Sequence, residues 1–315
     1  METPIVKIAH LSHRYSVQWA IRDINFEIYQ KGVLGLLGSN GAGKSTTMNI
    51  MCGVLNQTEG EVYIDGVNFR ADPIRAKLNI GFLPQRPPLY ADLTVDEYLR
   101  YCAELRSVPP REIRERVEMA KQKCGVTRFS RRVIKFLSGG YQQRVGIAQA
   151  IIHGPKFVVL DEPTNGLDPN QILEIRQLIK EIAEDRSVLL STHILSEVEA
   201  TCDHIKMIEA GHLVFSGTIG EFNNYLQPDS LVATFKQPPG EDELRTIPGI
   251  SAVEPLSAGA FRLRFNADDD VTCRVVDLSV ARGWALSEIT VERCSLDTVF
   301  AQLSGKRDQQ TRTNA

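Results

Sequence analysis

A short glycine-rich stretch carries the residues best suited to bind phosphate. Residues 38–46 have the sequence GSNGAGKST and follow the apolar run 33–37. Three glycines let the backbone curl with its N–H groups inward, and a helix beginning there adds partial positive charge. Lys44 would reach the β- and γ-phosphates, and the Ser45 hydroxyl would ligate Mg²⁺. The pattern favours a nucleoside triphosphate site over the alternative, a glycine turn with a solvated lysine.

A second stretch has the chemistry of another anion-binding helix end. Residues 137–144 have the sequence LSGGYQQR, in which Ser138 is an expected helix N-cap followed by two glycines. Two such helix ends in one chain need two phosphate-binding events, or one nucleotide clamped between two chains.

Polar side chains also follow directly after two of the apolar runs. Asp161 and Glu162 directly follow the run 157–160, and His193 comes just after the run 187–190. Asp168 and Pro169 then begin a helix with isoleucines on one face. Continuous apolar strands alternating with amphipathic helices predict a buried, largely parallel sheet, and such sheets bind ligands at the carboxyl ends of their strands.

The elements that position these residues can be placed from periodicity. Strands are expected at 5–8, 24–28, 62–64 and 80–83, with Tyr15 in a polar loop and Gln85 just beyond the last strand. A helix is expected after the glycine loop, where Met48, Met51 and Leu55 recur at helical spacing.

Residues 86–136 are expected to form a helical subdomain. Thr94 and Glu97 have capping-box spacing, and Leu99, Cys102 and Leu105 supply an expected buried stripe. A second helix follows two prolines and repeats apolar residues at Ile113, Val117, Ala120 and Cys124.

Composition limits the class of protein. The 315 residues suggest about two domains, and a net charge of -3 gives no global field for nucleic acid. The six cysteines are scattered without a CxxC pair, which favours reduced thiols in a cytosol over zinc or disulfides. Neither a secretory leader nor an apolar run near membrane-spanning length is visible, so we expect a soluble chain whose membrane role depends on a partner.

The last third has a different pattern. Short strands are expected at 231–235, 250–253, 261–265 and 284–291, with helices near 271–278 and 296–303. The order βαββαβ plus a final helix suits a small ferredoxin-like α+β domain. The predicted boundaries are 1–218 for the first domain and 219–303 for the second, with a disordered tail at 304–315.

Taken together, these stretches resemble the motifs of ABC ATPases, in that family's order, from Ile5 to about Gly217. The residues 137–144 resemble the family's signature motif. The resemblance implies a P-loop NTPase α/β core with a helical subdomain, which binds ATP and Mg²⁺ and hydrolyses ATP. It also implies that Ser138 and Gly140 contact the γ-phosphate on the other subunit of a homodimer.

The resemblance also assigns roles. Tyr15 would stack on adenine, Glu162 would orient or deprotonate the attacking water, and His193 would hydrogen-bond the γ-phosphate. Asp161, Ser45 and Gln85 would serve Mg²⁺, with Gln85 also sensing the membrane partner. The nucleotide-contacting residues implied are Tyr15, Gly38, Ser39, Asn40, Gly41, Ala42, Gly43, Lys44, Ser45, Thr46, Ser138, Gly139, Gly140 and Asp168.

One position departs from the family pattern. Ser39 stands where members commonly carry proline, which should cost loop rigidity rather than chemistry. The acidic pair Asp161 and Glu162 is intact, so a competent hydrolase is expected.

The region from Thr218 to Phe300 resembles the C-terminal extension of ATPase subunits from short bacterial exporters, which serve drug, lipid, polysaccharide, copper-related or gliding-motility systems. By resemblance, the chain would power export through separately encoded transmembrane permease subunits, at the inner face of the cell membrane. Two alternatives remain open, a soluble ABC ATPase acting on nucleic acid or ribosomes and a ligand-regulated sensor. The near-neutral charge and the single ATPase cassette argue against nucleic acid as a partner.

Overall fold

The computed structural model describes residues 3–225, 228–257, 259–266 and 270–292. The chain divides into two compact units, unit 1 up to Ile219 and unit 2 from Gly220 to Gln302. Each unit has a hydrophobic core of its own.

Unit 1 is built around a six-stranded sheet in the order β10-β9-β3-β8-β7-β6. The strands from β9 to β6 are parallel, and only β10 pairs antiparallel. The predicted largely parallel sheet is therefore confirmed. The strand bounds are Gly32–Leu37 (β3), Ile80–Leu83 (β6), Phe157–Asp161 (β7), Ser187–Ser191 (β8), His204–Glu209 (β9) and His212–Thr218 (β10).

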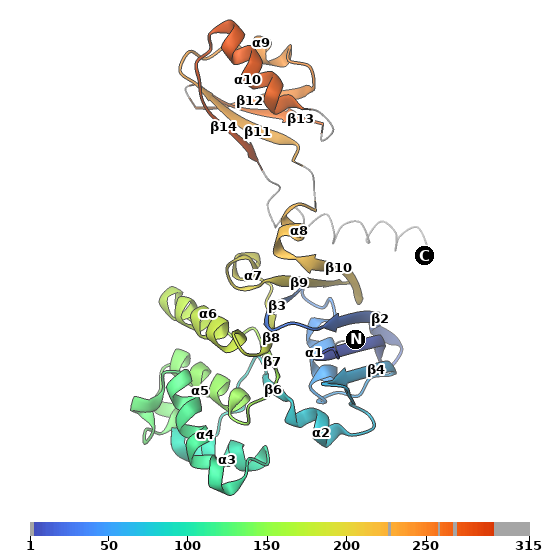
Figure 1. Ribbon diagram of the computed structural model, residues 1–315, viewed down its shortest axis with the longest axis vertical. Coiled ribbons are helices and arrows are strands. Elements are labelled where there is room, and N and C mark those ends of the chain that lie inside the picture. Colours follow the sequence, from blue (N-terminus) through green and yellow to red (C-terminus); the bar gives the residue numbers. More distant parts are fainter. Residues whose placement is uncertain (1–2, 226–227, 258, 267–269, 293–315) are drawn as a thin grey trace. The chain divides into compact units, whose positions relative to one another are not determined.

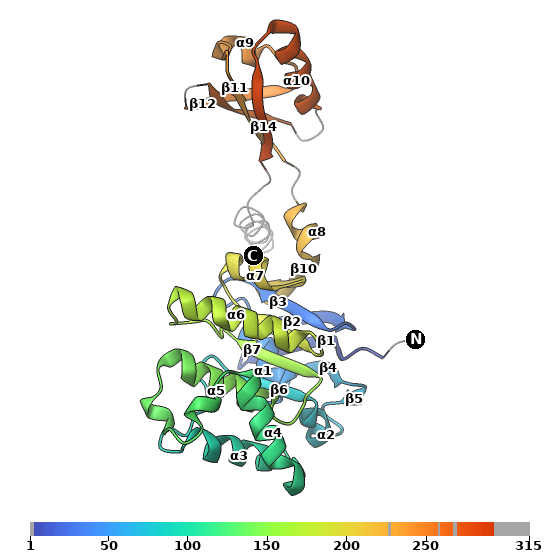
Figure 2. The same cartoon turned by 60° about the vertical axis from the view of Figure 1, so that its left-hand side comes forward.

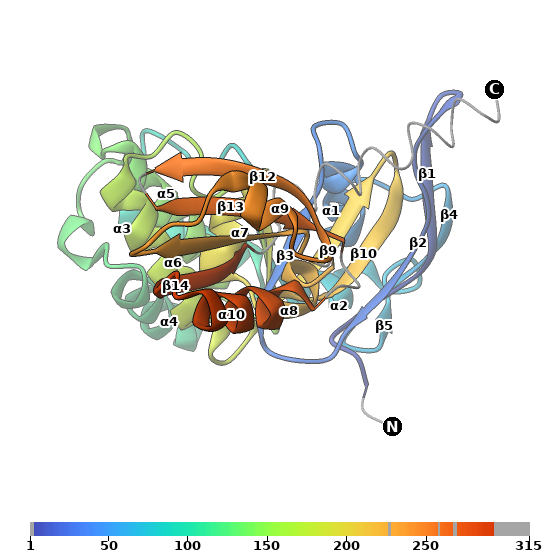
Figure 3. The ribbon, with the colours of Figure 1, turned by 90° about the horizontal axis from the view of Figure 1, so that it is seen from above.

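A second sheet in unit 1 is antiparallel, in the order β2-β1-β4-β5, and β1 and β2 run side by side along most of their length (Figure 3). Strand β1 extends beyond the predicted strand 5–8 and ends at Tyr15, so the predicted place of Tyr15 in a loop is wrong. The bounds are Val6–Tyr15 (β1), Gln18–Ile28 (β2), Glu59–Ile64 (β4) and Val67–Asn68 (β5).

Helix α1, Lys44–Met51, follows β3 and the glycine loop. Its residues Met48 and Met51 are buried in one core with side chains from both sheets, so the helix that follows the loop is fixed between them. Leu55 lies beyond the end of this helix. A short helix, α2, spans Pro73–Leu78.

Helices α6, Pro169–Ala183, and α7, Leu195–Thr201, pack against strands of the six-stranded sheet (Figure 2). The Asp168 side chain accepts a bond from the Gln171 N–H at 3.0 Å and so caps α6, as the sequence predicts. A further helix, α8, spans Ile219–Asn223.

The stretch between β6 and β7 is mainly helical (Figure 1), and the predicted capping box at Thr94 and Glu97 is present. The Lys121 side chain is 1% exposed, and its ammonium donates to Asp96, Glu118 and Ser130 at 2.5, 2.8 and 2.9 Å. The bounds are Val95–Leu105 (α3), Pro110–Lys123 (α4), Thr127–Phe129 (η1), Ile134–Phe136 (η2) and Gly139–Ile151 (α5).

The predicted buried stripe of α3 is wrong at one position. Leu105 ends the helix and is 65% exposed, whereas Tyr98 and Leu99 are fully buried. The buried face therefore runs through Val95, Tyr98, Leu99 and Ala103, because the tyrosine ring packs inward and its hydroxyl donates to the Pro88 carbonyl at 3.2 Å.

Unit 2 has the element order β-α-β-β-α-β that the sequence predicts. Its antiparallel sheet has the order β12-β13-β11-β14, and Trp284 packs edge-on against Phe235 in its core. The bounds are Ser230–Phe235 (β11), Glu241–Arg245 (α9), Ile250–Ser257 (β12), Ala260–Phe265 (β13), Val271–Arg282 (α10) and Leu286–Glu292 (β14). The predicted helix at 296–303 and the tail at 304–315 lie outside the described residues.

Within these described ranges, no helix combines the length and the apolar character needed to cross a membrane.

Candidate active site

The glycine loop lies at the carboxyl end of β3 and is tightly packed at Gly38. A Cβ on Gly38 would lie 2.1 Å from the Ile208 carbonyl oxygen. Lys44 is 6% exposed, and its Nζ donates to the Gly38 and Ser39 carbonyls at 2.9 Å each. Burial lowers the pKa of Lys44, while the nearby carboxylates of Glu162 and Asp161 oppose that shift. The loop thus holds a desolvated cation inside a ring of backbone groups.

Ser39 is anchored by a residue far along the chain. Its N–H donates to Glu209 Oε2 at 3.1 Å and its hydroxyl donates to Glu209 Oε1 at 2.6 Å. Glu209 ends β9, the strand beside β3. This anchor opposes the loss of rigidity expected from serine at this position, and proline could not make either bond because it lacks both donors.

The Glu162 carboxylate makes hydrogen-bond contacts with three side chains from three loops. Gln85 Nε2 and Asn165 Nδ2 donate to its Oε2 at 2.7 and 3.2 Å, and His193 Nδ1 lies 2.9 Å from its Oε1. Its backbone has φ of 47°, which is uncommon for a residue with a side chain, and its N–H donates to the Ser191 carbonyl at 3.0 Å. The strained turn lifts the carboxylate off the end of β7 and toward Gln85 and His193.

Asp161 is the neighbouring carboxylate, at the end of β7. Burial raises its pKa, and the charge of Glu162 adds to that effect. A desolvated carboxylate next to a second one favours a cation, and Ser45 at the start of α1 supplies a hydroxyl oxygen. These oxygen donors suit Mg²⁺, which uses one or two carboxylates together with substrate phosphates. In the described part of the chain, no group of three or more His, Cys, Asp or Glu side chains could hold a metal alone.

The second predicted helix end opens on a separate cavity of about 270 Å³. Ser138 is the N-cap of α5, and it lines the cavity together with Gly140 and Asp168. A Cβ on Gly140 would lie 2.3 Å from Gln171 Oε1, so a larger residue there would have to displace the Gln171 side chain. The residues that line this cavity include none of the glycine loop, so the cavity and the loop are separate places on the chain.

Tyr15 is 53% exposed at the end of β1. Its ring makes an edge contact with His13, with centroids 4.7 Å apart, which fixes the ring while it remains accessible to a planar ligand.

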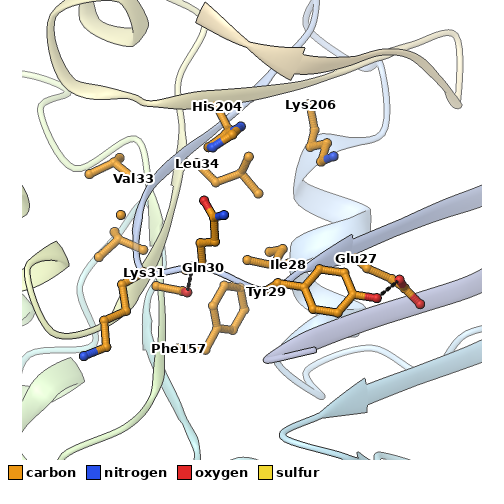
Figure 4. Close-up of a pocket in the computed structure, with 13 residues that line it drawn as sticks. Glu27, Ile28, Tyr29, Gln30, Lys31, Val33, Leu34, Phe157, His204 and Lys206 are labelled. Carbon is orange, nitrogen blue, oxygen red and sulfur yellow. Dashed lines mark hydrogen bonds between the residues drawn. The ribbon is translucent and has the colours of Figure 1, made fainter. Parts of the chain in front are cut away.

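Another pocket, of about 240 Å³, lies at the opposite ends of the strands (Figure 4). Its lining includes Gly32, Phe157, Ser187 and His204, the first residues of β3, β7, β8 and β9. In Figure 4, the Tyr29 hydroxyl points to Glu27 and donates to it. Open α/β sheets bind nucleotides at the carboxyl ends of their strands, so this pocket is not the nucleotide site.

The structure therefore brings Gln85, Glu162 and His193 into direct contact, and it places Ser138, Gly140 and Asp168 in another cavity. Sequence reasoning missed Asn165, which donates to Glu162, and Glu209, which anchors Ser39. It also missed Glu197, which accepts from the hydroxyls of Thr164 and Thr192. A lone polar residue carries no periodic signal, so nothing in the sequence pattern pointed to these three side chains.

The family model described as ABC transporter matches residues 21–165, and a model described as AAA domain, putative AbiEii toxin, Type IV TA system, matches residues 142–199. The bacitracin transport ATP-binding protein BcrA of Bacillus licheniformis is 36% identical over 212 residues, which cover 67% of this chain and 68% of that protein. The chain belongs to the ABC transporter ATP-binding subunits.

Similarity to this ABC family continues beyond unit 1. The linearmycin resistance ATP-binding protein LnrL of Bacillus subtilis is 27% identical over 307 residues, 96% of this chain and 99% of that protein. A dimeric structure of the ATP-binding cassette MJ0796 in a post-hydrolysis state, bound to ADP and Pi, has 27% identity and a TM-score of 0.61. The structural match covers 68% of this chain and 98% of the MJ0796 chain. The ABC subunit described here is an ATP hydrolase coupled to transport.

Proposed function

We propose that this ABC subunit powers export through separately encoded permease subunits, from the inner face of the membrane. The observation that carries the catalytic part is the convergence of Gln85, Asn165 and His193 on Glu162. The outward direction is supported by relatives named for bacitracin transport and for linearmycin resistance.

Glu162 is the proposed base. Its carboxylate would accept a proton from the attacking water, and the His193 ring, 2.9 Å away, would fix the carboxylate and reach the γ-phosphate. Lys44 would exchange its bonds to loop carbonyls for bonds to the β- and γ-phosphates. Mg²⁺, held by Asp161, Ser45 and Gln85, would neutralise phosphate charge.

Two half-sites in one chain support a homodimer with two ATP molecules between its subunits. Ser138 and Gly140 would bind the γ-phosphate held by the glycine loop of the other subunit, with Asp168 beside them. A known cassette of similar fold is a dimer bound to ADP and Pi. ATP would then join the subunits and hydrolysis would release them.

We further propose that residues 1–218 act as the ATPase domain, in which the helical subdomain 86–136 docks the permease and Gln85 reports that contact. Residues 219–303 would form an accessory domain. In the helical subdomain, the Lys121 ammonium connects α3, α4 and the η1 turn, which gives a permease a single surface to push.

The test is ATP-dependent dimerisation of Glu162→Gln, measured by light scattering. Glutamine keeps the shape of the side chain and loses the base, so ATP stays bound and the dimer accumulates, while hydrolysis falls by about a hundredfold or more. The matched control is Glu199→Gln, an exposed glutamate on α7, which should behave as wild type.

Lys44→Ala should remove dimerisation by removing nucleotide binding. If Glu162→Gln hydrolyses ATP as fast as wild type, Glu162 is not the base. If it stays monomeric with ATP while still binding it, the shared-nucleotide dimer is wrong.

A further inference from the structure

Glu197 is a buried acid that none of the family motifs used above includes. It lies on α7 with 2% of its surface exposed, and both of its carboxylate oxygens are occupied. Oε1 accepts from the Thr164 hydroxyl at 2.6 Å, and Oε2 accepts from the Thr192 hydroxyl at 2.8 Å. The Arg176 guanidinium on α6 lies 3.8 Å from Oε1 and balances part of the charge. A carboxylate is costly to bury without such partners, so this one has a defined geometry.

The two threonines belong to the two loops that present the catalytic groups. Thr164 lies two residues after Glu162, in the loop that leads to Asp168. Thr192 immediately precedes His193, and its hydroxyl also accepts the Ile194 N–H at 3.1 Å. Thr164 is 7% and Thr192 2% exposed, so water does not compete strongly for either bond.

These contacts form a closed ring. The two loops are joined at one point by the 2.9 Å contact between Glu162 and His193. They are joined at a second point by Glu197, which accepts from both Thr164 and Thr192. Neither loop can then shift without stretching a charge-assisted bond to Glu197.

We infer that Glu197 is a positioning residue for ATP hydrolysis, which sets Glu162 and His193 at a fixed separation by holding the hydroxyls of Thr164 and Thr192. This inference rests on the proposed roles of Glu162 and His193. Glu197 itself stays buried behind the loops and acts only through them.

The experiment removes each hydroxyl while keeping the branched shape of the side chain. In the full-length chain, Thr164→Val and Thr192→Val should each lower kcat roughly ten- to a hundredfold, with KM for ATP changed less than about twofold, since misplaced catalytic groups slow the chemical step. The double variant should be about as slow as the slower single variant, because both bonds act through one carboxylate.

Three controls separate positioning from stability. Thr201→Val changes a third buried threonine, at the end of α7. Its hydroxyl has no hydrogen-bond partner, so this variant should leave kcat unchanged. Thr164→Ser and Thr192→Ser keep the hydroxyl and should retain most of the rate. Every assay is run below the unfolding transition of each variant, as measured by scanning calorimetry.

The inference is overturned if both valine variants keep kcat within twofold of wild type, or if the serine variants are as slow as the valine variants. Glu162→Gln is assayed in parallel. A fast Glu162→Gln would refute the proposed base, whereas a slow Glu162→Gln beside fast valine variants would refute only the role of Glu197.

Discussion

The carboxylates at the candidate active site of unit 1 have different surroundings from the arginine-paired carboxylates of unit 2. In unit 2, Glu254 and Glu292 are paired with the guanidinium of Arg262, and Arg264 also pairs with Glu254, so the pKa of each carboxyl is lowered. In unit 1, Glu162 accepts from amides and an imidazole, and burial raises the pKa of Asp161. Carboxylates already paired with arginine are stable surface groups, whereas those without a fixed cation remain ready for a proton or a metal ion.

The same contrast appears in the backbone. The strands of unit 2 pair antiparallel, so carboxyl ends alternate between the two edges of its sheet. In unit 1, five parallel strands bring their carboxyl ends, and the loops that follow them, to one edge. A convergent site therefore forms in unit 1, while the charged pairs of unit 2 fit a structural or contact surface.

The largest expected effect tests whether catalysis depends on unit 1 alone, by replacing one glycine with alanine in each unit. Gly38→Ala should reduce ATP hydrolysis by about a thousandfold or more, because the new Cβ meets the Ile208 carbonyl at 2.1 Å and deforms the loop. Gly240→Ala in unit 2 meets nothing within 4 Å and should leave the rate within about twofold. Steady-state ATPase assays measure both, and an equal loss in the two variants would refute the assignment of chemistry to unit 1.

Acid should weaken unit 1 through the partly buried His153, and unit 2 has no histidine that could respond in the same way. His153 donates from Nε2 to the Ile80 carbonyl at 3.0 Å, and its Nδ1 is buried without a partner. Burial, with help from Arg106, lowers the pKa of His153 to about 4, so the folded chain keeps this ring neutral.

The sign of the effect follows from that depressed pKa. As pH falls below about 6.5, the unfolded chain binds a proton that the folded chain refuses, so stability is lost down to about pH 4, by up to about 3 kcal/mol. His153→Gln should remove this component. Urea unfolding at pH 7 and pH 4.5 measures it, and an identical pH dependence in the variant and wild type would contradict the prediction.

The smallest expected effect comes from removing one hydrogen bond between a serine hydroxyl and a glutamate in each unit. Ser39 donates its hydroxyl to Glu209 at 2.6 Å, and Ser230 in unit 2 donates its hydroxyl to Glu292 at 2.9 Å. Ser39→Ala should weaken ATP binding by about fivefold, equivalent to about 1 kcal/mol, because the glycine loop loses one of its anchors. Ser230→Ala should destabilise unit 2 by a similar energy and leave ATP binding unchanged. Calorimetric titration with ATP tests the pair, and weaker binding in both variants would mean that the units are energetically coupled.

Much of unit 1 could be predicted from the sequence because its elements carry strong local signals. Continuous apolar runs identified the parallel strands β3, β6, β7 and β8 but not β9, and the capping box of α3 and the Asp168 cap of α6 were readable from spacing alone. The short helix α9 has five residues and no apolar period, so only the expected βαββαβ order allowed for it.

The failures have a common physical origin in long-range packing. Leu105 fits a helical period but ends its helix in solvent, since Tyr98 fills the inner face instead. Glu197 and Glu209 hold residues distant in the sequence, and tertiary contacts of single polar side chains leave no pattern along the chain.

Lys121 gives the helical subdomain a mechanical property. One buried ammonium connects α3 through Asp96, α4 through Glu118 and the turn after α4 through Ser130, at 2.5 to 2.9 Å. A force applied at one end of these helices would therefore turn them together rather than compress them. In the transport cycle proposed above, the subdomain would act as a lever, and this cluster would help a push from a membrane partner to reach the strand that leads to Gln85.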